Sequence, residues 1–139
     1  MQLHLGRLVD HVHLRARNLD ATKRFYKAAL GALGIPVGTE GDDHVSFDEL
    51  WIDSLKGEEA SATHVHLAFQ AADRESVARF YAAGLAAGGR DNGPPGERDY
   101  APGYYAAFLI DPDGNNVEAV FHGPADRSAA SVVVTFGKP

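Results

Sequence analysis

The chain contains no cysteine in 139 residues. This absence excludes a disulfide framework, a thiolate zinc site and a cysteine nucleophile. Basic residues are also scarce: 13 Lys and Arg stand against 19 Asp and Glu, which gives a net charge of −6. An acidic chain without a Lys/Arg cluster lacks the electrostatic surface that nucleic acids require. We therefore expect no nucleic-acid partner.

Long apolar runs are absent as well. No hydrophobic stretch approaches the roughly 20 residues that a membrane-spanning helix needs. The first residues, MQLHLGRLVDH, lack the basic start and the apolar run of a signal peptide. We therefore expect no membrane partner and a cytoplasmic protein. The length suits one compact domain with a substantial core.

What the chain does contain is a twofold repeat. Residues 10–35 begin with DHVHL and residues 63–89 with THVHL, and each copy continues into an amphipathic segment and ends in glycine. Alternating apolar and polar residues predict a strand, and apolar residues at helical spacing predict a helix. Asp20 and Asp73 are the expected N-caps of the two helices.

Short strands are expected after each helix, between turns rich in glycine, aspartate and proline. They lie at residues 37–39, 44–47, 50–55, 104–110 and 116–122. The segment 90–103 carries too much proline, glycine and charge to be regular. It is expected either to cover a site or to form an ordinary surface loop. The order is therefore βαβββ twice.

This order predicts an α+β fold in which two βαβββ modules form a single domain, residues 1–139. Module one spans about residues 7–56, and module two spans about residues 62–122. The extension 123–139 contains one further expected strand, SVVVTF, at residues 131–136.

The histidines of the repeat lie on one face of each predicted strand. Side chains alternate along a strand, so His11 and His13 share a face, as do His64 and His66. The apolar residues between them are expected to pack on the helices. Glu118 lies mid-strand in module two, where an unpaired carboxylate would be costly to bury. Two histidines from separate strands and one glutamate form the ligand set that divalent Fe, Mn, Ni, Co and Zn favour.

A resemblance to a known superfamily covers roughly residues 8–122. The residues that carry it are His11, Leu14, Leu19, Phe25, Tyr26, Leu30 and Gly31 in module one, with THVHL at 63–67 and DPDGNNVE at 111–118 in module two. On these residues the chain resembles the vicinal oxygen chelate superfamily, which includes glyoxalase I, extradiol dioxygenases, fosfomycin-modifying enzymes and bleomycin-binding proteins. The resemblance implies that the paired modules form a glyoxalase-like cup, a curved mixed sheet around a metal ion. It also implies a homodimer.

The same resemblance implies which residues bind the metal. The family's first-strand ligand falls on His11, the ligand of its second module on His64 and its carboxylate ligand on Glu118. Asp53 lies near the position of a fourth ligand that glyoxalase I possesses. The resemblance leaves open whether the metal site lies within one chain or is shared across a dimer.

Other residues are candidates for catalysis or for contact with substrate. Glu118 and His66 are the candidate catalytic residues, because both lie on strand faces that are expected to point into the cup. The candidates for substrate contact are His13, Asp53, Arg98, Tyr100 and Tyr105. Tyr104 and Tyr105 could also flank the metal ligands.

These residues predict a divalent-metal-dependent enzyme that binds vicinal oxygens of a small, oxygen-rich substrate. The reaction would be of the lyase, isomerase or dioxygenase type, because an open position on a metal can polarise a carbonyl or carry dioxygen. The alternative is a metal-free protein of the same fold that binds a drug-like small molecule, as bleomycin resistance proteins do. Dependence on a metal separates the two.

Overall fold

The computed structural model describes residues 2–5, 10–56, 62–123 and 132–135. Within these residues the chain forms two helices and nine strands. In chain order the elements are β1 (Gln2–Leu5), β2 (Val12–Ala16), α1 (Leu19–Ala32), β3 (His44–Phe47), β4 (Leu50–Ser54), β5 (His66–Gln70), α2 (Arg74–Ala86), β6 (Arg90–Glu97), β7 (Tyr105–Ile110), β8 (Asn116–Phe121) and β9 (Val132–Thr135). The predicted α+β class is confirmed.

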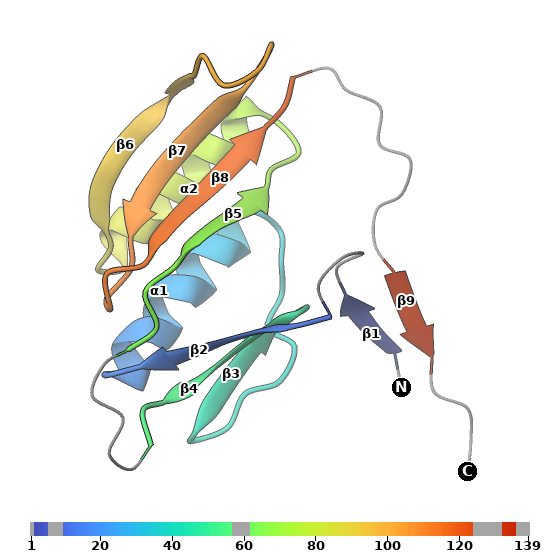
Figure 1. Ribbon diagram of the computed structural model, residues 1–139, viewed down its shortest axis with the longest axis vertical. Helices are drawn as coiled ribbons and strands as arrows, with labels where there is room; N and C mark the ends of the chain where they lie inside the picture. Colours follow the sequence, from blue (N-terminus) through green and yellow to red (C-terminus); the bar gives the residue numbers. More distant parts are fainter. Residues whose placement is uncertain (1, 6–9, 57–61, 124–131, 136–139) are drawn as a thin grey trace.

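Each module has its own mixed sheet. Strands β2, β4 and β3 form a three-stranded sheet in that order, and β5, β8, β7 and β6 form a four-stranded sheet (Figure 1). In both sheets the first strand of the module runs parallel to the last. The predicted strand at 37–39 is not regular, but it pairs with β3: Gly38 N donates to Ser46 O, and Ser46 N donates to Thr39 O, at 2.8 Å each. Module one therefore also follows the βαβββ order.

One segment is more regular than its composition predicts. An irregular loop was expected over residues 90–103, but Arg90–Glu97 forms β6, an edge strand that pairs with β7. The register of this pairing shifts at two places between Asp91 and Gly96. The two consecutive prolines lie within this irregular stretch of an edge strand, where a missing backbone N–H is tolerated.

The helices begin where side chains cap their first turn. Helix α1 begins at Leu19, one residue before the predicted cap Asp20, because the side chain of Asn18 accepts a hydrogen bond from the backbone of Ala21. Asp20 instead lies in the first turn, where its charge suits the helix dipole. The predicted cap of α2, Asp73, is confirmed.

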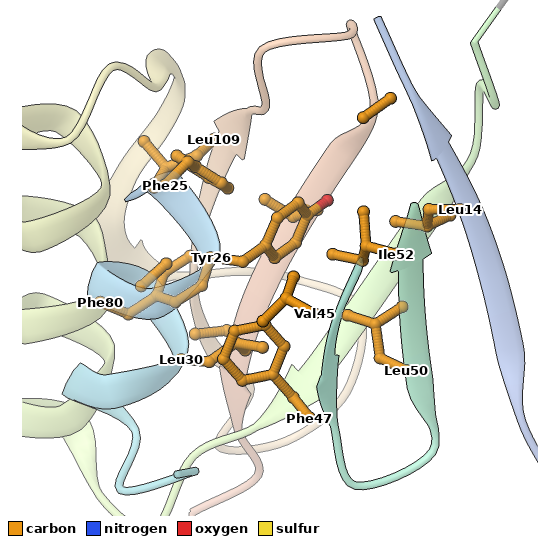
Figure 2. Packing of buried hydrophobic residues seen from close by; sticks show 14 of the residues in the cluster. Leu14, Phe25, Tyr26, Leu30, Val45, Phe47, Leu50, Ile52, Phe80 and Leu109 are labelled. Carbon is orange, nitrogen blue, oxygen red and sulfur yellow. The ribbon is translucent and has the colours of Figure 1, made fainter. Parts of the chain in front are cut away.

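Helix α1 lies between the two modules and supplies much of their common core. Figure 2 shows Phe25, Tyr26 and Leu30 of α1 near Phe80 and Leu109 of module two on one side, with the strands of module one on the other. All five side chains are at most 1% exposed. The helices therefore cover one apolar face of each sheet and leave the opposite face open.

A buried polar network also joins the modules. The hydroxyl of Tyr26 donates to Oδ2 of Asp111 at 2.6 Å, and the side-chain amide of Asn115 donates to the same oxygen at 2.7 Å. Oδ1 of Asn115 accepts a hydrogen bond from the backbone of Val65. Burial and the adjacent Asp111 carboxylate raise the pKa of Tyr26 well above its ordinary value. The predicted turn at 111–114 therefore anchors module two to α1.

The two ends of the described chain meet in a small antiparallel ribbon. Strand β1 pairs with β9, with Gln2 opposite Thr135. The strand predicted in the extension is therefore confirmed. Among the residues that the structure describes, no helix is long and apolar enough to cross a membrane.

Candidate functional site

The candidate site lies on the face of the four-stranded sheet that α2 does not cover (Figure 1). On this open face Ala106, Phe108 and Val120 form a second apolar cluster, with Tyr104 packed against it. The three cluster residues are at most 9% exposed. Polar side chains surround this apolar floor. An apolar surface with a few converging polar groups is typical of ligand sites.

Glu118 lies in the middle of β8 on this open face and is only 2% exposed. Each carboxylate oxygen has its own partner: Nε2 of His66 lies 2.8 Å from Oε1, and the hydroxyl of Tyr104 donates to Oε2 at 2.6 Å. Burial and the bond to Glu118 raise the pKa of Tyr104 to about 12. The phenol is therefore a donor at neutral pH. The two contacts offset the cost of burying the carboxylate.

The position of Tyr104 depends on two glycines. Gly103 and Gly123 both have a φ of +74°, and their backbones touch. A Cβ on Gly103 would lie 3.1 Å from the carbonyl oxygen of His122. Glycine tolerates both this conformation and this close approach. The contact fixes Tyr104 beside Glu118, with its ring edge-on to His122 at 5.1 Å.

A second histidine–carboxylate contact lies on the three-stranded sheet. Nε2 of His13 on β2 lies 2.8 Å from Oδ1 of Asp53 on β4, and nitrogens of Arg15 and Lys56 lie 3.4 and 3.5 Å from the same carboxylate. Burial opposes the ionisation of Asp53, but the bond to His13 and the nearby cationic groups outweigh it. The pKa of Asp53 is therefore below its ordinary value. Two predicted substrate contacts, His13 and Asp53, thus bind each other.

One chain does not assemble the three predicted metal ligands. His11 precedes β2, and its side chain is 68% exposed. His64 precedes β5 and is exposed, four residues before Ala68, which pairs with Glu118. Within the described ranges, no group of three or more His, Cys, Asp or Glu side chains is placed to hold a metal ion. The histidine that contacts Glu118 is His66.

Two of the predicted substrate contacts line a pocket in the segment that leads into β7. The pocket has a volume of about 560 Å³ and is formed by residues 97–104, which include Arg98 and Tyr100. Tyr104, at its end, donates to Glu118. The pocket therefore shares one residue, Tyr104, with the contacts around Glu118.

Tyr105 lies on the other face of the sheet. Its ring packs against the main core, and the guanidinium of Arg74 on α2 lies 4.6 Å from the ring centroid. Neighbouring residues of a strand point to opposite faces, so Tyr105 lies on the helix-covered side, away from the open face. Tyr104 occupies the position on the open face.

Sequence patterns did not identify the contact between His13 and Asp53 or the role of Tyr104 as a donor to Glu118. The first depends on the register of β2 and β4, which lie far apart in the chain, and the second on how the residue before β7 meets β8. One available signal was the βαβββ order itself. It pairs the first strand of each module, which carries the histidines, with the last strand, which carries the carboxylate.

Comparison with known proteins agrees with the modular fold. Residues 8–119 match the family model of the Glyoxalase/Bleomycin resistance protein/Dioxygenase superfamily. No curated protein matches the chain.

Several solved structures share the fold. A glyoxalase/bleomycin resistance protein from Albidiferax ferrireducens is 33% identical, with a TM-score of 0.66 over 81% of this chain and 97% of that one. A glyoxalase-related enzyme from Fulvimarina pelagi is 19% identical, with a TM-score of 0.68 over 94% and 99% of the two chains. A lactoylglutathione lyase from Agrobacterium tumefaciens is 20% identical, with a TM-score of 0.57 over 79% and 90%.

Proposed function

Because the chain belongs to the Glyoxalase/Bleomycin resistance protein/Dioxygenase superfamily, we propose that it is a divalent-metal-dependent enzyme acting on a small, oxygen-rich substrate. The observation that carries the proposal is the contact between His66 and Glu118, 2.8 Å long, on an open sheet face with an apolar floor. Imidazole and carboxylate groups are common ligands of divalent Fe, Mn, Ni, Co and Zn. The reaction is of the lyase, isomerase or dioxygenase type.

The third ligand would come from a second copy of the chain. Among the described residues of one chain, His66 is the single histidine that contacts Glu118, and no cluster there supplies three metal ligands. His11 is exposed at the start of β2, where another molecule can reach it. The proposed enzyme is therefore a homodimer in which module one of each copy faces module two of the other.

The chain's own residues would prepare Glu118 for this role. Tyr104 holds Oε2 of Glu118 through its donated hydrogen bond. Oε1, the oxygen near His66, would then be the one that binds the metal ion. The raised pKa of Tyr104, about 12, keeps the phenol protonated. A bound divalent ion would supply Lewis acidity toward the oxygens of the substrate.

The test is the metal content of protein purified without chelators, measured for the wild type and for Glu118→Gln. Near-stoichiometric divalent metal in the wild type, lost in a folded variant, supports the proposal. A wild type that is metal-free and does not take up added Ni, Mn, Fe or Zn ends it. Size-exclusion chromatography with light scattering reports the dimer, and a monomer that binds metal fully would exclude the shared site.

A metal-free binding protein is the second candidate. The observation in its favour is that Glu118 is already partnered on both oxygens, by His66 and Tyr104, without an ion. Such a protein would be stabilised against heat by an aromatic or drug-like ligand, and EDTA would leave this stabilisation unchanged. An enzyme that needs metal would lose activity, and its metal-dependent ligand binding, after the same treatment.

A further inference from the structure

The guanidinium of Arg98 is fixed on the open face of the four-stranded sheet. Nη2 donates to the carbonyl oxygen of Pro94 at 2.7 Å, and Nη1 donates to that of Glu97 at 3.2 Å. Cζ lies 5.5 Å from the ring centroid of Phe108. The ring of His66 lies 6.1 Å from the same Phe108 centroid. Arg98 and the contact between His66 and Glu118 are therefore neighbours around one aromatic ring.

Two glycines make room for this guanidinium. A Cβ on Gly96 would lie 2.9 Å from Nη1 of Arg98, and a Cβ on Gly93 would lie 3.3 Å from Nη2. Gly93 has a φ of +146°, which other residues rarely adopt. The segment NGPPGER therefore builds a space in β6 that the arginine head group fills. The side chain is held in position before any ligand binds.

Within the part of the chain that the structure describes, the positive charge of Arg98 has no carboxylate partner. None of the ion pairs among the described residues includes it. The two carbonyl oxygens orient the guanidinium but do not neutralise it, and five N–H donors are available on the group. In a chain of net charge −6, a fixed and unneutralised cation beside a pocket favours an anionic ligand.

The lining of the pocket indicates which anion. Tyr100 and Tyr104 line it together with Arg98, and their rings meet edge-to-face at 5.1 Å. Aromatic walls suit a flat apolar group. Glu97 and Asp99 also line the pocket, so a singly charged carboxylate is repelled less than a doubly charged phosphate. The guanidinium fork matches a carboxylate in geometry.

We propose that Arg98 is the anion-binding group of this site and that the site takes a small aromatic carboxylate. The carboxylate would lie on Arg98, and the ring would pack against the two tyrosines. The inference rests on the proposed function in placing the substrate there. Its own contacts, however, involve no metal.

The test is the binding of benzoate to EDTA-treated protein, measured by calorimetry, with neutral benzamide and inorganic phosphate as comparisons. Benzoate should bind the wild type more tightly than benzamide or phosphate does. Arg98→Gln should lower the affinity for benzoate by about tenfold or more and leave the affinity for benzamide unchanged. Arg79→Gln is the matched control, because Arg79 is an exposed arginine of α2 that donates to Ser76 and does not line the pocket. It should bind benzoate as the wild type does.

Equal benzoate affinity in the wild type and Arg98→Gln overturns the inference, as does equal binding of benzoate and benzamide to the wild type. If Arg98→Gln does not fold, the Nε–H resonance of Arg98 in the wild type decides: it must shift during a benzoate titration, and an unmoved resonance overturns the assignment. Glu118→Gln separates the two proposals. Loss of metal with retained, Arg98-dependent benzoate binding supports both, whereas retained metal in Glu118→Gln counts against the metal site alone.

Discussion

Nε2 of His66 lies 2.8 Å from Oε1 of Glu118, and Nε2 of His13 lies 2.8 Å from Oδ1 of Asp53. In each repeat, therefore, the second histidine of HVHL contacts a carboxylate on the last strand of its own module. The first histidines precede their strands and are exposed. The duplication thus preserves a pair of contacts on the open sheet faces as well as a fold.

Tyr104→Phe tests the hydrogen bond from the Tyr104 hydroxyl to Glu118. The variant removes the hydroxyl that donates to Oε2, and a hydrogen bond to a buried charged group is worth about 1.5–3 kcal/mol. We expect the free energy of unfolding, from urea denaturation at pH 7, to fall by this amount. Tyr100→Phe is the control, since Tyr100 is 68% exposed. Equal effects of the two substitutions would contradict the assigned role.

Tyr26→Phe tests the link between the modules. It removes the hydroxyl bonded to Asp111 and should cost about 1.5–3 kcal/mol of unfolding free energy. The folded-state pKa of Tyr26 is raised, so this contribution is fully present below the ordinary phenol pKa of 10.0. It is lost as pH rises above that value toward the folded-state pKa. The difference between wild type and variant should be constant from about pH 6 to 9; a difference that grows above pH 10 would be inconsistent with the raised pKa.

Asp53→Asn tests the contact on module one. The folded-state pKa of Asp53 is lowered from 3.8, so its carboxylate stabilises the fold above that value. The contribution is lost as pH falls through the lower, folded-state pKa. The wild type should therefore exceed the variant in unfolding free energy at pH 7, and the gap should narrow below about pH 4. A gap independent of pH would show that the carboxylate charge contributes nothing.

Two helical glycines should respond to alanine in opposite directions. A Cβ on Gly84 of α2 would overlap Cδ1 of Leu109 and lie 3.3 Å from Cε2 of Phe25, both buried. Gly84→Ala should lower the unfolding free energy by about 1–3 kcal/mol. Gly31 of α1 has no atom within 4 Å of such a Cβ, so Gly31→Ala should raise it by about 0.5 kcal/mol. Thermal or urea unfolding of both variants measures the signs, and an unchanged or raised unfolding free energy in Gly84→Ala would reject the close packing of α2.

Much of the fold follows from short-range patterns. Alternation and helical spacing predicted the order of strands and helices in both modules. The cap of α1 was misplaced by two residues, because Asn18 and Asp20 are both good capping residues and the choice depends on where the preceding strand ends. Composition failed at β6, where pairing with β7 overrides the proline and glycine content.

The site was less predictable because it depends on strand register. A strand places its histidines on one face, but the partner of each depends on which residue of the neighbouring strand lies beside it. Ala68 pairs with Glu118, and this register brings His66, two residues away, to the carboxylate. His64 is two residues farther and lies outside β5. The sequence pattern therefore identifies the strand face that carries the histidines, but not which of the two histidines contacts Glu118.

The measurement that bears most directly on the proposed site is the divalent metal content of His66→Gln and His64→Gln, purified in parallel with the wild type without chelators. If His66 and Glu118 are ligands, His66→Gln should lose the metal, and His64→Gln should keep a wild-type content at an equal circular dichroism signal. Retention of metal by His66→Gln together with its loss from His64→Gln would contradict the assignment of His66.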